Sequence, residues 1–366
     1  MQTANDMEQL HLPRGNLCLM ERKSIPIYAY NMTLTESEFL QREFNLTLTE
    51  IDQNLENALE TEPAFAIATC DPKEIEGILV KCKNNSALVF FFGNETYDVP
   101  QIMWLNKYSN KIKFAYIYNY PRKTSFFITF RCLLGAIYDG GLKYWEKDRN
   151  IVRNFKNGID LMRRTRRIKP IFEFSDFPQG YSKRFIEELT AEKFLVDKGS
   201  LLNRAPIFND SKKQVICFTG QSGSWCRSLA ISVLKKYDPT FSPSYTQGWG
   251  GSNQGNNNTY VNGLASSKFA LNPPGNLTNR THRYLESLIM NSLPIMPPST
   301  LQDPHLWGVW SEYQVVKRFS WKKQLRFSNK LKENQIQRII LNELKLEKNK
   351  IDAINMNLDK LFLGIG

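Results

Sequence analysis

The chain has little histidine, and its cysteines form no recognisable metal-binding or redox pair. Only three histidines occur in 366 residues, and the six cysteines are scattered. A structural zinc site needs clustered cysteine and histidine, so this pattern argues against one and favours reduced, mostly buried thiols. No Asp-x-Asp pair stands at a plausible strand end, so we expect neither a required metal nor a resident cofactor.

Long apolar runs are also missing. No run approaches the roughly 18–20 residues that span a bilayer, and residues 1–16 lack the apolar core of a signal peptide. We therefore expect a cytoplasmic protein. A hydrophobic content of 42% and an aromatic content of 12% indicate a folded chain. Its length suits two domains.

Acidic residues are too few to balance the basic ones, and the net charge is +12. The densest basic part, residues 143–169, includes Arg163, Arg164, Arg166 and Arg167. The candidate partners are an anionic membrane surface, a saccharide or lipid-linked acceptor, and nucleic acid, with a solvated helical face as the ordinary alternative. Nucleic acid is the least favoured, because no helix-turn-helix, zinc-finger or RNP motif occurs. If a membrane is the partner, the protein is peripheral to its inner face.

Strand-like and helix-like segments alternate, which is typical of an α/β protein. Strand candidates are residues 64–68, 78–80, 87–92, 112–118, 126–130 and 171–174, and helix candidates are residues 37–59, 150–164 and 182–195. Residues 197–209 are predicted as a linker, which separates an N-terminal α/β domain of residues 1–205 from a second α/β domain of residues 206–320. Residues 247–258 are too rich in glycine and asparagine to pack. Residues 321–366 are predicted as C-terminal helices that pack back on the body.

A glycine- and serine-rich loop follows the apolar run at residues 215–218 and leads into a helix that contains Arg227. The loop includes Gly220 and Ser222. A strand, such a loop and a helix can bring backbone N–H groups against a phosphate, although most turns of this kind are only turns. The loop is not a P-loop, because no Gly-Lys-Ser/Thr follows, and it lacks the third glycine of a dinucleotide fingerprint.

The strongest pattern lies at residues 268–298, which are predicted as strand, loop, helix and short strand. Two prolines and a glycine end the strand, and Gly275 and Asn276 lead toward a helix that begins near His282 and Arg283. Glu286 follows one turn later. A helix N-terminus with free N–H groups and added positive charge suits a phosphate, so these residues predict a pocket for a nucleotide sugar.

This segment resembles the signature of the exostosin-like glycosyltransferases and their microbial relatives. The matching residues are Phe269, Leu271, Pro273, Gly275, Asn276, Thr281, His282, Arg283, Glu286, Leu288, Pro294 and Ile295. The resemblance implies a GT-B-like fold, with two Rossmann-like α/β domains facing across a cleft and the second domain holding a nucleoside-diphosphate sugar as the donor substrate. It also implies that Arg227 faces the nucleotide and that Glu286 accepts the ribose hydroxyls. The implied activity is sugar transfer to a saccharide or lipid-linked acceptor in polysaccharide or glycan synthesis.

Such a transfer needs positive charge at the leaving diphosphate, for which Arg227, Arg283 and His282 are the candidates. The general base for the acceptor is expected from the first domain. Asp176 and Asp139 are suitably placed there, although acidic residues at strand ends more often form turns or caps. Arg283 and Glu286 could instead form an ordinary helix ion pair. A basic nucleic-acid-binding protein and a catalytically silent scaffold, suggested by Pro274 in place of the family's arginine, remain alternatives.

Overall fold

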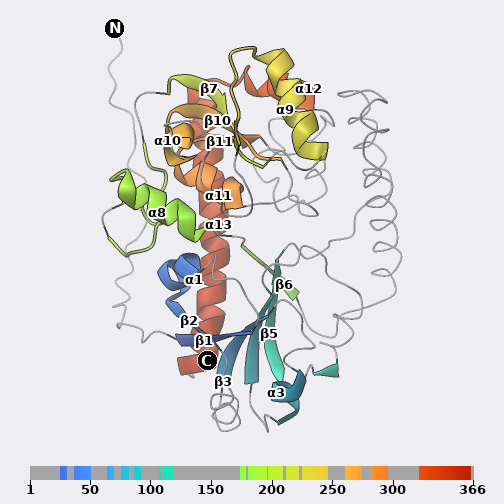
Figure 1. The fold of residues 1–366 in the computed structure, drawn as a ribbon. Coiled ribbons are helices and arrows are strands. Elements are labelled where there is room, and N and C mark those ends of the chain that lie inside the picture. The colour runs from blue at the N-terminus through green and yellow to red at the C-terminus, as the bar shows by residue number, and fades with distance from the viewer. Residues whose placement is uncertain are drawn as a thin grey trace.

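The computed structural model describes residues 25–30, 37–50, 64–69, 76–81, 86–91, 107–118 except 109, 174–208 except 179 and 196, 212–245 except 222–224, 260–273, 282–295 and 321–363. These residues form a mixed α/β protein with parallel sheets (Figure 1). The α/β class predicted from the alternation of segments is therefore confirmed.

The larger sheet has six parallel strands in the order β2-β1-β3-β4-β5-β6. The strands are β1 (Ile25–Tyr30), β2 (Leu46–Glu50), β3 (Ala64–Thr69), β4 (Ser86–Phe91), β5 (Ile112–Tyr118) and β6 (Phe174–Phe177). Three successive residues of β3, Phe65, Ala66 and Ile67, are buried, as expected where both faces of a parallel sheet are covered. β2 lies on one side of β1 and the later strands on the other, so the strand order reverses between β1 and β3.

Two predicted segments of this region need correction. The helix predicted over residues 37–59 ends early, because α1 (Ser37–Phe44) stops at Asn45, which has a φ of 52°, and β2 follows. Asparagine tolerates this left-handed conformation, which commonly ends a helix. The strand predicted over residues 78–80 is instead part of helix α3 (Glu76–Lys81). A short apolar run does not distinguish a strand from a buried helical segment.

Helix α8 (Lys183–Ala191) and the segment after it join the larger sheet to the rest of the chain. Ser182 caps α8 by accepting a hydrogen bond from the backbone N–H of Phe185. The ring of Tyr181 packs edge-on against Phe39 of α1, with ring centroids 5.1 Å apart. The start of α8 is therefore fixed by both a helix cap and an aromatic contact.

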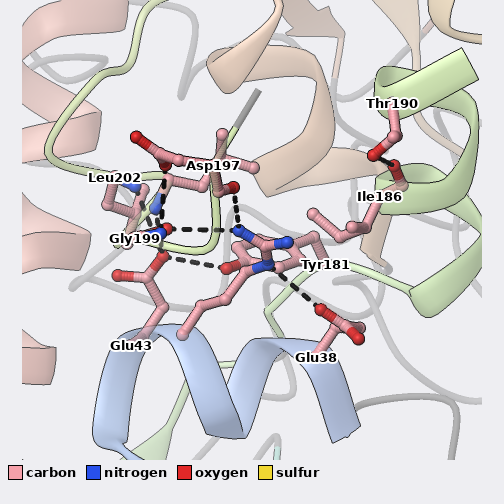
Figure 2. A network of polar contacts seen from close by, with 10 residues as sticks. Glu38, Glu43, Tyr181, Ile186, Thr190, Asp197, Gly199 and Leu202 are labelled. Carbon is pink, nitrogen blue, oxygen red and sulfur yellow. Dashed lines mark hydrogen bonds and ion pairs between the residues drawn. The ribbon is translucent and has the colours of Figure 1, made fainter. Parts of the chain in front are cut away.

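Glu43 of α1 is the centre of a polar network at this junction (Figure 2). Its Oε1 accepts hydrogen bonds from Tyr181 Oη at 2.9 Å and from the backbone N–H groups of Leu201 at 2.9 Å and Leu202 at 3.3 Å. Its Oε2 accepts one from Ser200 Oγ at 2.7 Å. The residue is only 8% exposed, so these donors replace the water that a carboxylate would otherwise bind.

Arg42 extends the network to the segment predicted as an interdomain linker. Its guanidinium donates to the backbone carbonyl oxygens of Asp197 at 2.9 Å and Gly199 at 3.3 Å, and it pairs with Glu38 at 3.1 Å. Figure 2 shows Asp197 and Gly199 in a loop above α1. Residues 197–202 are thus attached to α1 through backbone atoms at several points.

The smaller sheet has three parallel strands in the order β11-β10-β7. They are β7 (Gln214–Cys217), β10 (Ser267–Leu271) and β11 (Leu293–Ile295). A short strand, β8 (Thr219–Gly220), continues from β7 after one residue and pairs with β9 (Ser244–Tyr245). Helices α9 (Trp225–Tyr237), α10 (Tyr260–Ala265) and α11 (His282–Ile289) follow β8, β9 and β10 along the chain.

The C-terminal helices α12 (Trp321–Ser328) and α13 (Glu333–Leu363) complete the described structure. α13 passes alongside both sheets (Figure 1): it packs against α11 and β11 and, nearer its C-terminus, against α1 and β3. Asn355 donates to the backbone carbonyl of Glu43 and Asn357 to Tyr116 Oη, each at 2.9 Å. The buried residues recur at helical spacing: Ile336, Ile339, Ile340, Leu344, Ile351, Ile354 and Leu358. Within the part of the chain that the structure describes, no helix is long and apolar enough to cross a membrane.

Candidate functional site

The carboxyl ends of β7 and β10 part from one another. Their pairing runs from Ser267 opposite Gln214 to Ala270 opposite Cys217. Beyond it, β8 pairs with β9, whereas the backbone N–H of Asn272 donates to Ile295 of β11. In open parallel α/β sheets, ligands bind outside the carboxyl ends of the strands. This end of the smaller sheet is therefore a candidate binding site.

Arg283, in the first turn of α11, reaches this strand end. Its Nε donates a hydrogen bond to the backbone carbonyl of Thr219 at 3.0 Å, and its guanidinium carbon lies 5.6 Å from the ring centroid of Phe218. Among the described residues, no carboxylate lies within ion-pair distance of this partly buried guanidinium. A partly desolvated cation without an acidic partner favours the binding of an anion.

Gly220 lets the guanidinium approach the strand closely. Its φ is 154°, and a Cβ at this position would overlap Arg283 Nη2 and lie 2.9 Å from Arg283 Cζ. Any side chain here would therefore displace Arg283. Because Gly220 has no side chain, the Arg283 guanidinium lies directly against the backbone of β8.

A second guanidinium comes from the helix after β8. Arg227, in the first turn of α9, donates from Nη1 to the backbone carbonyl of Gln221 at 3.5 Å. Arg227 and Arg283, from two different helices, thus contact the backbone within three consecutive residues of one strand end. His282 is the first residue of α11 and is partly buried. The structure therefore brings together Gly220, Arg227 and Arg283, which the sequence predicts as ligand-binding residues.

Glu286 makes no ion pair with Arg283, although the two are three residues apart on α11. Its Oε1 accepts hydrogen bonds from the backbone N–H of Ser182 at 2.9 Å and from Ser182 Oγ at 2.8 Å. Its Oε2 accepts one from Tyr260 Oη at 2.7 Å. Glu286 is 2% exposed. Protein donors thus occupy both oxygens of the carboxylate that the sequence resemblance assigns to ribose hydroxyls.

Two tyrosines, the buried Tyr181 and the partly buried Tyr260, make the stability of the protein sensitive to alkaline pH. Burial raises the pKa of Tyr181 well above its ordinary value of 10.0, and the Glu43 carboxylate adds to this. Burial and then the Glu286 carboxylate raise the pKa of Tyr260 likewise. Both folded pKa values lie above the unfolded value, so this stability is present below pH 10 and is lost as the pH rises through the folded values. We expect the free energy of unfolding to fall above about pH 10 by about 1.4 kcal/mol per pH unit for each tyrosine.

Urea unfolding between about pH 9 and pH 11.5 measures this dependence. Tyr181→Phe and Tyr260→Phe should each flatten it, whereas Tyr245→Phe, at a 41% exposed position, should leave it as in the wild type. If the free energy of unfolding of both Tyr181→Phe and Tyr260→Phe fell with pH as steeply as that of the wild type, these tyrosines would not be the cause of the alkaline instability.

Several predicted residues lie outside the described part of the chain. These are Ser222, Gly275, Asn276 and Asp139, together with Arg163, Arg164, Arg166 and Arg167 of the basic segment. Asp176 lies within β6, opposite Ile117 of β5, and not after the end of a strand. In the described residues, no group of three or more histidine, cysteine, aspartate or glutamate side chains could hold a metal ion.

Sequence reasoning did not select Phe218, Thr219, Tyr260 or Ser182. Phe218 and Thr219 act through a ring face and a backbone carbonyl, neither of which leaves a motif. Ser182 did carry a signal, because a serine directly before an amphipathic run is a typical helix N-cap. Tyr260 had none, because its partner Glu286 lies 26 residues away.

Comparison with known proteins gives little similarity. No family model matches the chain, and no curated protein matches it. Among solved structures, D-2-hydroxyisocaproate dehydrogenase is similar at 10% sequence identity over 93% of this chain and 98% of that chain, with a TM-score of 0.21. A TM-score this low carries no argument for a shared fold or reaction.

These comparisons contradict the identification of the chain as an exostosin-like glycosyltransferase. No glycosyltransferase family model matches the chain, and no curated glycosyltransferase matches it. The family prediction and the enzyme class taken from it are therefore wrong. The described residues of the match form a strand and a helix that bring polar groups to one strand end, and unrelated α/β proteins share this arrangement.

Proposed function

We propose that this protein binds a ligand that carries a diphosphate, such as a nucleoside diphosphate, at the carboxyl end of β7 and β8. The observation that carries the proposal is Arg283, whose guanidinium lies at this strand end with no acidic partner among the described residues. Arg227 adds a second positive charge at the same segment. Two guanidinium groups suit two phosphate groups, because each can donate paired hydrogen bonds to phosphate oxygens. The proposal concerns binding and names no reaction.

The finer fold prediction, two Rossmann-like halves facing across a cleft as in GT-B proteins, is part of this proposal. It is supported by the parallel pairing in both sheets and by one contact between them. Ser182, which follows β6 at a distance of five residues, meets Glu286 of α11, the helix that follows β10. The carboxyl ends of β6 and β10 therefore lead to a common point, as a ligand shared by the two halves would require.

Isothermal titration calorimetry with inorganic pyrophosphate and a panel of nucleoside diphosphates tests the proposal. We expect saturable binding, with a nucleoside diphosphate tighter than pyrophosphate if the rest of the ligand is also contacted. No heat of binding at millimolar concentrations of any of these ligands would overturn the proposal.

The nucleic-acid alternative makes a different prediction for the same experiment. Binding to a nucleic acid releases several counterions and weakens steeply with salt. Titrations with a short duplex and with pyrophosphate at 50 and 200 mM salt, about a fourfold range, therefore distinguish the two. A duplex that binds much more tightly than pyrophosphate at low salt would favour the alternative. Attachment of the basic segment at residues 163–167 to an anionic membrane stays a proposal, which vesicle co-sedimentation can test.

Gly220→Ala is expected to weaken diphosphate binding by about tenfold, which corresponds to about 1.4 kcal/mol. The physical reason is that the added methyl group would overlap the Arg283 guanidinium and move it from the strand end. Gly263→Ala is the matched control, because Gly263 lies in α10 and a methyl group added there would have no atom within 4 Å. Equal affinities of the two variants would show that the approach of Arg283 to the strand does not matter for binding.

A further inference from the structure

We propose that Glu286 is the positioning residue of this anion site, because it fixes the first turn of α11, and with it Arg283, against the N-terminus of α8. The inference rests on the proposed function. It assigns to Glu286 a role through Arg283 and not a contact with the ligand.

Glu286 joins three segments that are far apart in the sequence. One carboxylate oxygen accepts two hydrogen bonds from Ser182, and the other accepts one from Tyr260. The residue is almost completely buried. Three donors directed at one buried carboxylate leave it little freedom, because any movement would leave a buried donor or charge without its partner.

The N-terminus of α8 is a favourable place for this negative charge. Ser182 is the N-cap of α8, and its Oγ donates to Glu286 while it accepts from the backbone N–H of Phe185. A carboxylate at a helix N-terminus also interacts favourably with the helix dipole. The anchoring of α11 thus uses the ordered start of another helix.

α8 is in turn tied to α10, so that three helices form a closed set of contacts. Glu188 of α8 accepts a hydrogen bond from Arg184 Nε at 2.9 Å and one from the backbone N–H of Val261 at 3.2 Å. Val261 is the second residue of α10, and the first, Tyr260, donates to Glu286. Each of the helices α8, α10 and α11 is therefore attached to both of the others.

The orientation of α11 decides where Arg283 points. α11 has eight residues, and Tyr284, next to Arg283, is attached on another side by a hydrogen bond from its Oη to Glu343 of α13 at 2.5 Å. With Glu286 held at α8 and Tyr284 held at α13, rotation of the helix about its axis is prevented. Arg283 is then directed at Thr219 and not at Glu286.

Glu286→Gln tests this role at nearly constant side-chain volume. The carbonyl oxygen of glutamine can keep the two donors of Ser182, but its amide nitrogen only donates, so the hydrogen bond from Tyr260 Oη is lost or reversed. The negative charge at the N-terminus of α8 is lost as well. We expect pyrophosphate to bind Glu286→Gln about tenfold more weakly than the wild type. Glu187→Gln, at a 62% exposed side chain of α8, is the control and should bind as the wild type does.

The decisive measurement is a double-mutant cycle with Arg283→Ala, scored as the dissociation constant for pyrophosphate. If Glu286 acts only through Arg283, Glu286→Gln should cause no further loss of affinity in the Arg283→Ala background. If Glu286→Gln does not fold, as judged by circular dichroism, Ser182→Ala and Tyr260→Phe remove single donors and should each weaken binding in the wild-type background only.

Wild-type affinity in folded Glu286→Gln, or an equal loss in both backgrounds, would overturn the inference and leave the proposed function standing. Absence of pyrophosphate binding by the wild-type protein would instead overturn the proposed function, and the inference with it.

Discussion

Arg283→Ala is expected to weaken the binding of pyrophosphate and of nucleoside diphosphates by about ten- to one-hundredfold, with the fold unchanged. Hydrogen bonds between charged groups contribute about 1.5–3 kcal/mol each, and the guanidinium of Arg283 lacks a protein carboxylate that would compete for it within the described residues. Its removal costs the fold the hydrogen bond to the carbonyl of Thr219, which is a small loss. Calorimetric titration of the variant, with its thermal melting curve recorded in parallel, measures both effects.

Arg326→Ala provides the matched control for this variant. Arg326 is an exposed residue of α12, so the substitution removes the same charge from the protein at another place. If both variants lost affinity equally, the effect would come from net charge and not from a site. If Arg283→Ala bound as tightly as the wild type, the strand end would not be the binding site.

Glu43→Ala is expected to lower the free energy of unfolding by about 3–5 kcal/mol, the size seen when a buried charged network loses a member. The substitution leaves Tyr181 Oη, Ser200 Oγ and two backbone N–H groups without their acceptor in a buried place. Unsatisfied buried donors are costly, since each has given up a hydrogen bond to water. Urea unfolding monitored by circular dichroism gives the free energy.

Glu187→Ala is the corresponding control, because the Glu187 carboxylate is mostly exposed and its distance to Lys183 is 3.9 Å. Such a surface pair contributes at most about 1 kcal/mol, so this variant should unfold close to the wild type. If both variants lost a similar amount of unfolding free energy, the network of Figure 2 would contribute no more to stability than a surface ion pair does.

Local sequence signals predicted segments of the fold where residue type and spacing agreed. The apolar run at residues 64–68 became β3, the run at residues 112–118 became β5, and the serine-led amphipathic stretch became α8. The local signals failed where a short segment had a weak or ambiguous pattern. β1 contains Pro26, which weakens a strand signal, yet it lies inside the larger sheet between β2 and β3. Its place there comes from parallel pairing with strands distant in sequence.

For the candidate site, the sequence by itself determined which residues lie at strand ends and helix starts and are available to bind a ligand. It placed Gly220 at a strand end and Arg227 and Arg283 in the first turns of helices, because glycine breaks a strand and helix starts carry recognisable signals. It also suggested a family on the basis of about 30 residues, and this was wrong, since one local pattern of strand, loop and helix occurs in unrelated proteins.

Only the tertiary structure decided which partners these residues contact. Arg283 and Glu286 are near enough along α11 to form an ion pair, but the carboxylate instead binds Ser182 and Tyr260, which come from distant segments. The reason is that a buried carboxylate is stabilised by several fixed donors more than by one flexible partner. This choice leaves Arg283 directed at Gly220, 63 positions away in the sequence. No local pattern contains that contact, because it depends on the parting of β7 and β10 and on the packing of α11 against α8 and α13.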